Sequence, residues 1–179
     1  MTEDRKYQFS WDLIGDLDTA RPNLGPKLRL EAYRLLQFCT RDILEQRYGT
    51  EAADQIFYDA GNLAGKHFYE NALDHTPTDI NDLVKQLQST LVDIGIGIFK
   101  VEKINENMEC IMTVAEDLDC SGLPELGYGV CVYDEGFISG ILESFTGRPF
   151  NVKEIDCWCT NERTCRFEAK PKPIPAAAE

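Results

Sequence analysis

Apolar residues recur at helical spacing along the first half of the chain, in three runs separated by breaks. The first run covers residues 27–48, and Gly49 ends it. Thr50 is a suitable N-cap for the second run, whose apolar stripe continues to Phe68. The third run covers residues 80–94. We therefore predict three helices, and we expect the first two to form an antiparallel hairpin.

The spacing changes in the second half, where four short segments are rich in β-branched and aromatic residues and are bounded by turn residues. These predicted strands are residues 96–104, 109–115, 150–157 and 164–169. Glycines and a proline make residues 116–129 a loop, and residues 132–145 return to helical spacing. The order predicts a hairpin, a fourth helix and a final hairpin.

The whole pattern predicts an α+β fold, in which a helical layer packs on a twisted antiparallel sheet. The chain has 179 residues, enough for one domain with a proper core, and we assign that domain to residues 27–169. Residues 1–26 end in a segment with two prolines and a glycine and predict an irregular N-terminal strap. Residues 170–179 are rich in proline and alanine, which is typical of a tail or of a linker to a C-terminal effector domain.

Two glycines interrupt the second predicted helix. Gly61 and Gly65 lie four residues apart, and each costs about 1 kcal/mol relative to alanine in a helix. Small residues at this spacing indicate the close approach of another backbone or of a ligand. Tight packing between helices is the simpler of the two explanations.

The acidic balance of the chain excludes several kinds of partner. Asp and Glu number 31 against 18 Lys and Arg, which gives a net charge of −13. We expect no direct nucleic-acid contact and no membrane binding, because phosphate backbones and anionic bilayers attract basic surfaces. Seven cysteines without a secretory signal fit a reducing compartment, where thiols bind metal or pack in the core. We therefore expect a cytoplasmic protein.

Three cysteines and a glutamate gather around the late helix and the final hairpin. Cys131 directly precedes the helix, Glu154 and Cys157 lie on the first strand, and Cys165 lies on the second. Three thiolates and one carboxylate fill the four positions around a tetrahedral ion such as zinc. The predicted site is structural, since a catalytic zinc keeps one position open for water or substrate.

Spacing alone leaves two points of this site open. Cys157 and Cys159 face the same side of a regular strand, so either of them could be the ligand. Glu154 and Cys157 are three residues apart and face opposite sides unless a bulge intervenes. The alternative is that the cysteines are small buried apolar residues and that the glutamate is solvated.

The second half of the chain resembles the C-terminal half of the 4-vinyl-reductase-type domain, a small-molecule-binding family that includes aromatic-sensing input domains of bacterial activators. The resemblance is carried by the run GYGVCVYDEGFISGILESFTGRPFNVKEIDCWCTNERTCRFEA. It extends upstream over LEAYRLLQFCTRDILEQRYGTEAADQIFYDAGNLAGKHF, so that it covers most of residues 28–169.

The resemblance implies a metal, a ligand and an oligomeric state. In the sensor members, zinc is held at the spacing of Cys131, Glu154, Cys157 and Cys165, which selects Cys157 over Cys159. Iron is the other metal that this donor set leaves open. The family fold is often dimeric through its helices, and subunits of the TRAPP complex share it. The resemblance therefore implies a homodimer that binds a small apolar or aromatic ligand.

We expect a sensor or regulatory domain with a ligand pocket between helices and sheet. The candidate lining residues are Phe57, Phe68, Phe99, Met112 and Phe137. One alternative is a reductase or accessory protein acting on a tetrapyrrole vinyl group, and another is a dimeric scaffold without ligand. The enzyme is disfavoured, because the sequence has neither a glycine-rich dinucleotide fingerprint after a strand nor a clear pair of nucleophile and base.

Overall fold

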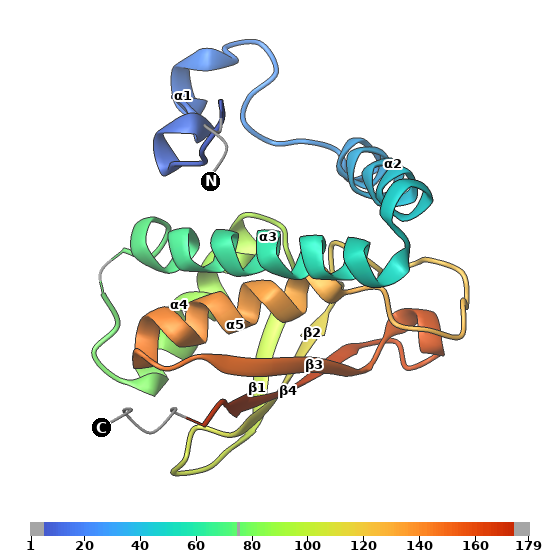
Figure 1. The fold of residues 1–179 in the computed structure, drawn as a ribbon. Helices are drawn as coiled ribbons and strands as arrows, with labels where there is room; N and C mark the ends of the chain where they lie inside the picture. Colours follow the sequence, from blue (N-terminus) through green and yellow to red (C-terminus); the bar gives the residue numbers. More distant parts are fainter. Residues whose placement is uncertain (1–5, 75, 174–179) are drawn as a thin grey trace.

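Helices and strands follow one another in the predicted order in the computed structural model, which describes residues 6–74 and 76–173. The elements are η1 (Trp11–Ile14), α1 (Leu17–Ala20), α2 (Leu30–Tyr48), α3 (Thr50–Asn71), α4 (Ile80–Asp93), β1 (Ile98–Ile104), β2 (Cys110–Ala115), α5 (Val132–Thr146), β3 (Phe150–Asp156), η2 (Trp158–Thr160) and β4 (Cys165–Pro171). The predicted α+β fold, a helical layer on an antiparallel sheet, is confirmed (Figure 1).

The two ends of the chain differ from the expectation in detail. The strap of residues 1–26 contains two four-residue helical turns, η1 and α1, between irregular segments. β4 continues through Lys170 and Pro171, which were expected to belong to the tail. The remaining parts of the strap and the tail, residues 1–5 and 174–179, lie outside the described residues.

The four strands form one antiparallel sheet in the order β1-β2-β4-β3. Both predicted hairpins are formed, and β4 joins them by pairing with β2, where Cys165 lies opposite Val114. The register of β3 shifts between Glu154 and Asp156. This irregularity supplies the bulge that Glu154 and Cys157 need in order to approach one site.

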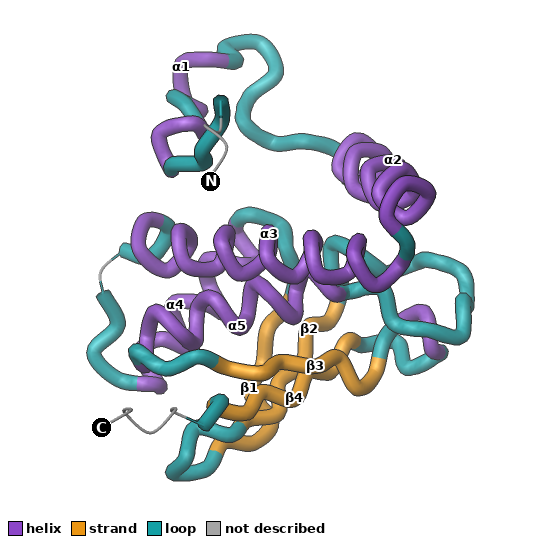
Figure 2. Tube along the Cα trace, viewed as in Figure 1, coloured by secondary structure: helices purple, strands orange, loops and turns teal. Residues whose placement is uncertain are grey.

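The helices cover one face of the sheet in two layers (Figures 1 and 2). α5 and α4 pack on the sheet, and α3 packs on α5. Core side chains come from the inner faces of α4 and α5 and from the sheet, including the fully buried Leu83, Phe150, Val152 and Phe167. α2 stands apart from this core and has no buried residue.

The backbones of α3 and α5 approach closely at a stripe of glycines. A Cβ atom at Gly65 would lie 2.1 Å from the carbonyl oxygen of Phe137, and one at Gly136 would lie 2.0 Å from that of Tyr58. Gly61 and Gly140 meet the opposite helix in the same way. The glycines of α3 therefore serve helix packing, the simpler of the two predicted explanations.

No helix among residues 6–74 and 76–173 combines the length with the hydropathy that a membrane crossing requires.

Candidate functional site

Four cysteine sulfurs meet beneath the start of α5. The Sγ atoms of Cys120, Cys131, Cys157 and Cys165 all lie within 4.8 Å of one another, and all four residues are buried. Three of them are the predicted cysteine ligands. The fourth, Cys120, comes from the loop between β2 and α5.

Each of the four thiols is positioned by a different piece of structure. Cys131 is the N-cap residue of α5, and Cys165 is the first residue of β4. Cys157 directly follows β3 and is the N-cap residue of η2. Cys120 lies in a tight turn in which the Asp117 carboxylate accepts its backbone N–H at 3.1 Å. The cluster therefore joins the sheet, the late helix and two loops at one point.

The spacing of the thiols fits a tetrahedral metal site. The Sγ atom of Cys131 lies 3.9 Å from that of Cys157 and 3.7 Å from that of Cys165. Four sulfurs at the usual zinc–sulfur bond length of about 2.3 Å are separated by about 3.8 Å. Cys120 and Cys165 are closer, with their sulfurs 3.0 Å apart, and all four thiols are free. The donor set is thus suited to a thiophilic ion such as zinc.

Cys157 is the thiol most readily ionised. Hydrogen bonds from the Cys120, Cys131 and Cys165 thiols lower its pKa, and a backbone hydrogen bond from Val130 acts in the same direction. A thiolate that receives backbone N–H bonds is the arrangement found in structural metal sites, where such bonds orient the ligand.

Glu154, the predicted carboxylate ligand, lies beside the cluster. Its Oε2 atom accepts the Cys131 backbone N–H at 3.4 Å, and its Oε1 atom is buried without a hydrogen-bond partner among the described residues. Burial raises the pKa of Glu154 to about 8. The group of four mutually close donor atoms contains Cys120 in its place, so direct coordination by Glu154 stays a prediction.

Sequence reasoning missed Cys120 and left Cys159 ambiguous. Cys120 has no metal-motif spacing to the other cysteines, and its position in the loop LDCSG gives no periodic signal. Cys159 lies on η2, and its backbone carbonyl accepts N–H bonds from Leu126 and Gly127. Its sulfur is buried but lies outside the group of four, whereas that of Cys157 lies within it.

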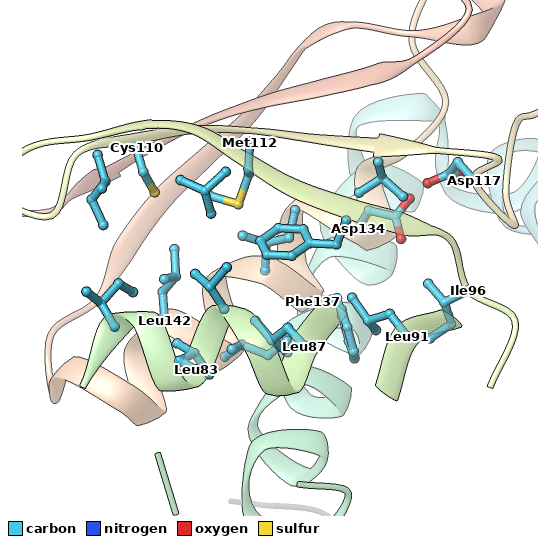
Figure 3. Close-up of a pocket in the computed structure, with 18 residues that line it drawn as sticks. Leu83, Leu87, Leu91, Ile96, Cys110, Met112, Asp117, Asp134, Phe137 and Leu142 are labelled. Atoms are coloured by element: carbon cyan, nitrogen blue, oxygen red, sulfur yellow. The ribbon is translucent and has the colours of Figure 1, made fainter. Parts of the chain in front are cut away.

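An apolar cavity lies next to the cluster, between α4, α5 and the sheet (Figure 3). Its volume is about 50 Å³. The apolar wall is formed mainly by the leucines of α4, the aliphatic and aromatic side chains of α5, and the inner faces of β1 and β2. The cavity is therefore placed as predicted, between helices and sheet.

The predicted lining is right in three positions out of five. Phe99, Met112 and Phe137 line the cavity. Phe68 is a core residue behind it, with its ring 5.1 Å from that of Phe137 in an edge-to-face contact. Phe57 lies on α3, where the guanidinium group of Arg41 stands over its ring, 5.5 Å from the ring centre. Periodicity identified inward-facing residues but could not tell cavity from core.

Two carboxylates close one end of the cavity, Asp117 from the loop after β2 and Asp134 from the first turn of α5 (Figure 3). Oδ1 of Asp117 accepts the backbone N–H groups of Asp119 and Cys120. Oδ2 of Asp134 is buried and has no hydrogen-bond partner among the described residues. Burial, aided by the neighbouring charge of Asp119, raises the pKa of Asp117 to about 7.

This end of the cavity adjoins the cysteine cluster. Donor atoms of Asp117, Cys131 and Asp134 lie within 4.8 Å of one another. Cys131 thus belongs both to the thiol cluster and to the boundary of the cavity. A change in the cavity that moves the first turn of α5 would also act on the cysteine cluster.

Comparison with known proteins places this site in a family. Residues 110–171 match the vinyl-4-reductase domain. The chain is 27% identical over 159 residues to the uncharacterized protein MJ0150 of Methanocaldococcus jannaschii, a match that covers 89% of this chain and 84% of that protein.

Two solved structures have the same fold. The phenol-responsive sensory domain of the transcription activator PoxR, solved with phenol, aligns with a TM-score of 0.62 and 17% identity over 80% of this chain and 75% of that one. Subunit 3 of the trafficking protein particle complex from Naegleria fowleri, covalently bound to palmitic acid, aligns with a TM-score of 0.55 and 14% identity over 80% of this chain and 97% of that one.

The family match spans β2 to β4 and so includes all four clustered cysteines and both carboxylates of the cavity. The predicted resemblance to 4-vinyl-reductase-type domains is confirmed on these grounds. The chain therefore carries a vinyl-4-reductase domain, built on a fold that phenol-sensing and vesicle-tethering proteins share.

Proposed function

We propose that this protein is a small-molecule sensor or regulatory domain, in which an apolar guest occupies the cavity between α4, α5 and the sheet. One observation carries the proposal: the apolar cavity meets the thiol cluster at the start of α5, so that one helix forms part of both. A guest that shifts α5 would change the surface of the domain, which a partner or an effector domain could recognise.

The bound molecules of the two structural neighbours support an apolar guest. One of them holds phenol, and the other is covalently bound to palmitic acid. The present cavity is smaller than a benzene site, since about 50 Å³ compares with the roughly 150 Å³ of an engineered benzene-binding cavity. An aromatic guest must therefore displace side chains of α4 or α5, and this displacement couples binding to a conformational change.

A structural zinc ion completes the proposed domain. Cys120, Cys131, Cys157 and Cys165 would hold it as four thiolates, with Glu154 as the ligand if the cluster rearranges. When bound, the ion would tie α5 to β4 and to the loop after β2, and its binding energy would contribute to folding. Reduced thiols agree with the expected cytoplasmic location.

A second copy of the chain is the proposed partner of α2. The side of α2 turned toward the body carries Tyr33, Arg34 and Gln37, which bond to the loop of residues 118–121. The outward side carries Leu35 and Leu36, which are 66% and 72% exposed. An apolar helix face that points into solvent is typical of a homodimer interface, and many relatives of this fold were expected to pair through their helices.

Calorimetric titration of the zinc-loaded protein with phenol and toluene tests the sensor proposal. We expect binding in the wild type and tighter binding in Leu87→Ala, because removing part of a cavity-lining side chain creates space for the guest. Ile56→Ala, an exposed site on α3, is the matched control and should bind as the wild type does. Absence of binding in both the wild type and Leu87→Ala at millimolar concentration would contradict the proposal.

The scaffold alternative makes the opposite prediction, since a domain that only dimerises needs no cavity next to Cys131. The observed apolar cavity therefore favours the sensor. The reductase alternative predicts that purified protein consumes a reduced nicotinamide or ferredoxin in the presence of a vinyl porphyrin, and the same preparation can be assayed for this activity.

A further inference from the structure

The cavity has a strong polarity along its length (Figure 3). Cys110 and Leu142 lie at its apolar end, and Asp117 and Asp134 lie at the other. These are the only two charged residues among those that line it in the described part of the chain. A site with one apolar end and one doubly acidic end fits a guest with a matching polarity.

Asp134 is the less satisfied of the two carboxylates. Its Oδ2 atom is buried, and no hydrogen bond to it is found among the described residues. The charged groups that act on it, Asp119, Asp117, Cys165 and Glu154, are all acidic. A buried carboxylate that lacks a donor is costly, and the cost falls when a donor or a cation is supplied.

Asp117 is fixed in place by the chain around it. Its carboxylate accepts N–H groups of Asp119 at 2.8 Å and Cys120 at 3.1 Å. Oxygen atoms of Asp117 and Asp134 lie within 4.8 Å of each other. Two buried carboxylates at this separation repel when both are ionised, and one positive group between them removes the repulsion.

We propose that the cavity selects an apolar molecule with a protonated amine head, which binds between Asp134 and Asp117 while its apolar body fills the space along α4. This inference rests on the proposed sensor function and names the class of its ligand. An ammonium group suits the site because it has three N–H donors and carries the charge that both carboxylates lack. A neutral hydroxyl head satisfies only part of this requirement, and a carboxylate guest is repelled.

The apolar wall distinguishes this site from a second metal site. Asp117, Cys131 and Asp134 could also hold an ion, but Cys131 already belongs to the thiol cluster. The leucines of α4, which extend from the carboxylates to the far end of the cavity, would have no role in coordinating an ion. They provide the surface that the apolar body of an amine requires.

Titration of the zinc-loaded chain with matched probes tests the inference. Benzylamine, benzyl alcohol, toluene and benzoate share one ring and differ in their head group. The order of affinity should be benzylamine, then benzyl alcohol, then toluene, with benzylamine at least about tenfold tighter than toluene and with no binding of benzoate. The same order is expected in Leu87→Ala, whose larger cavity admits the ring more easily.

Asp134→Asn is the decisive variant. It should remove the preference for benzylamine over toluene while leaving toluene binding within about twofold of the wild type. Its melting temperature without guest should equal or exceed that of the wild type, because the substitution removes a buried charge that has no partner. Asp93→Asn, an exposed carboxylate at the end of α4, is the matched control and should retain the preference.

The outcomes separate this inference from the proposed function. Toluene and benzylamine binding equally well, or Asp134→Asn retaining the preference, would overturn the amine assignment and leave the sensor proposal standing. Binding of none of the probes to wild type or Leu87→Ala would overturn both. Two zinc ions per wild-type chain, reduced to one in Asp134→Asn, would identify the carboxylate pair as a metal site and also overturn the assignment.

Discussion

α2 and α5 are both amphipathic helices in the same chain, yet they are used in opposite ways. α5 is buried along seven of its fifteen residues, between α3 and the sheet. α2 has nineteen residues, none of them buried, and it turns polar side chains toward the body. One helix is held by packing within the chain, while the other presents apolar side chains that this chain does not cover.

The difference follows from what each helix meets. The glycines of α5 allow the backbone of α3 to approach, and Cys131 anchors its first turn in the thiol cluster. α2 is attached to the body by hydrogen bonds, among them those from Tyr33 and Gln37 to the Asp119 carboxylate, each 2.7 Å long. The region around α5 should therefore govern folding, and α2 should govern association.

The largest effect is expected at the thiol cluster, on the α5 side of this comparison. Cys131→Ser should remove the metal ion and lower the free energy of unfolding by about 4 kcal/mol or more, because a structural ion contributes its binding energy to folding. Zinc analysis and thermal melting measure both quantities. Cys39→Ser changes an exposed thiol on α2 and should alter neither. A Cys131→Ser protein that kept one ion per chain would contradict the assignment.

Gly65→Ala should have the next largest effect. Alanine favours a helix by about 1 kcal/mol, but its Cβ atom would overlap the Phe137 carbonyl, so we expect a net loss of about 3 kcal/mol in unfolding free energy. Denaturant unfolding measures the change, and Ala60→Ser on the exposed side of α3 controls for the helix itself. Unchanged or increased stability would show that α3 and α5 are not held at this distance.

Leu36→Asp tests the α2 side. A charge placed in a dimer interface should weaken dimerisation by about 2 kcal/mol, a loss of roughly 30-fold in affinity, while monomer stability stays within about 0.5 kcal/mol. Light scattering over a concentration series measures the dimer dissociation constant. Arg47→Ala, at the exposed end of α2, provides the comparison. The proposed interface would be wrong if the wild type were monomeric at all concentrations or if Leu36→Asp left the dimer unchanged.

Tyr33→Phe should have the smallest effect. It removes one hydrogen bond to the buried Asp119 carboxylate and leaves the bond from Gln37, so we expect a loss of about 1.5 kcal/mol in unfolding free energy. Hydrogen exchange should show faster exchange in α2 with little change in α5. Equal acceleration in both helices would mean that α2 is part of the same cooperative unit as the core.

The sequence predicted the helices, strands and their order, because burying one face of an element imposes a spacing of 3.6 or 2 residues that can be read without any partner. It also identified Cys131, Cys157 and Cys165 as a group. Cys120 was not predicted, because it lies in a loop without periodic spacing and meets the others only through the pairing of β4 with β2.

The sequence by itself determined which faces of this chain avoid water and which thiols were available for a metal. Only the tertiary structure decided that the face of α5 packs inside the chain while the leucines of α2 point outward, and that Asp117 and Asp134 share one end of an apolar cavity. The physical reason is that hydrophobic spacing specifies burial without specifying a partner. Contacts between residues far apart in the chain depend on the path of the backbone, which local spacing does not encode.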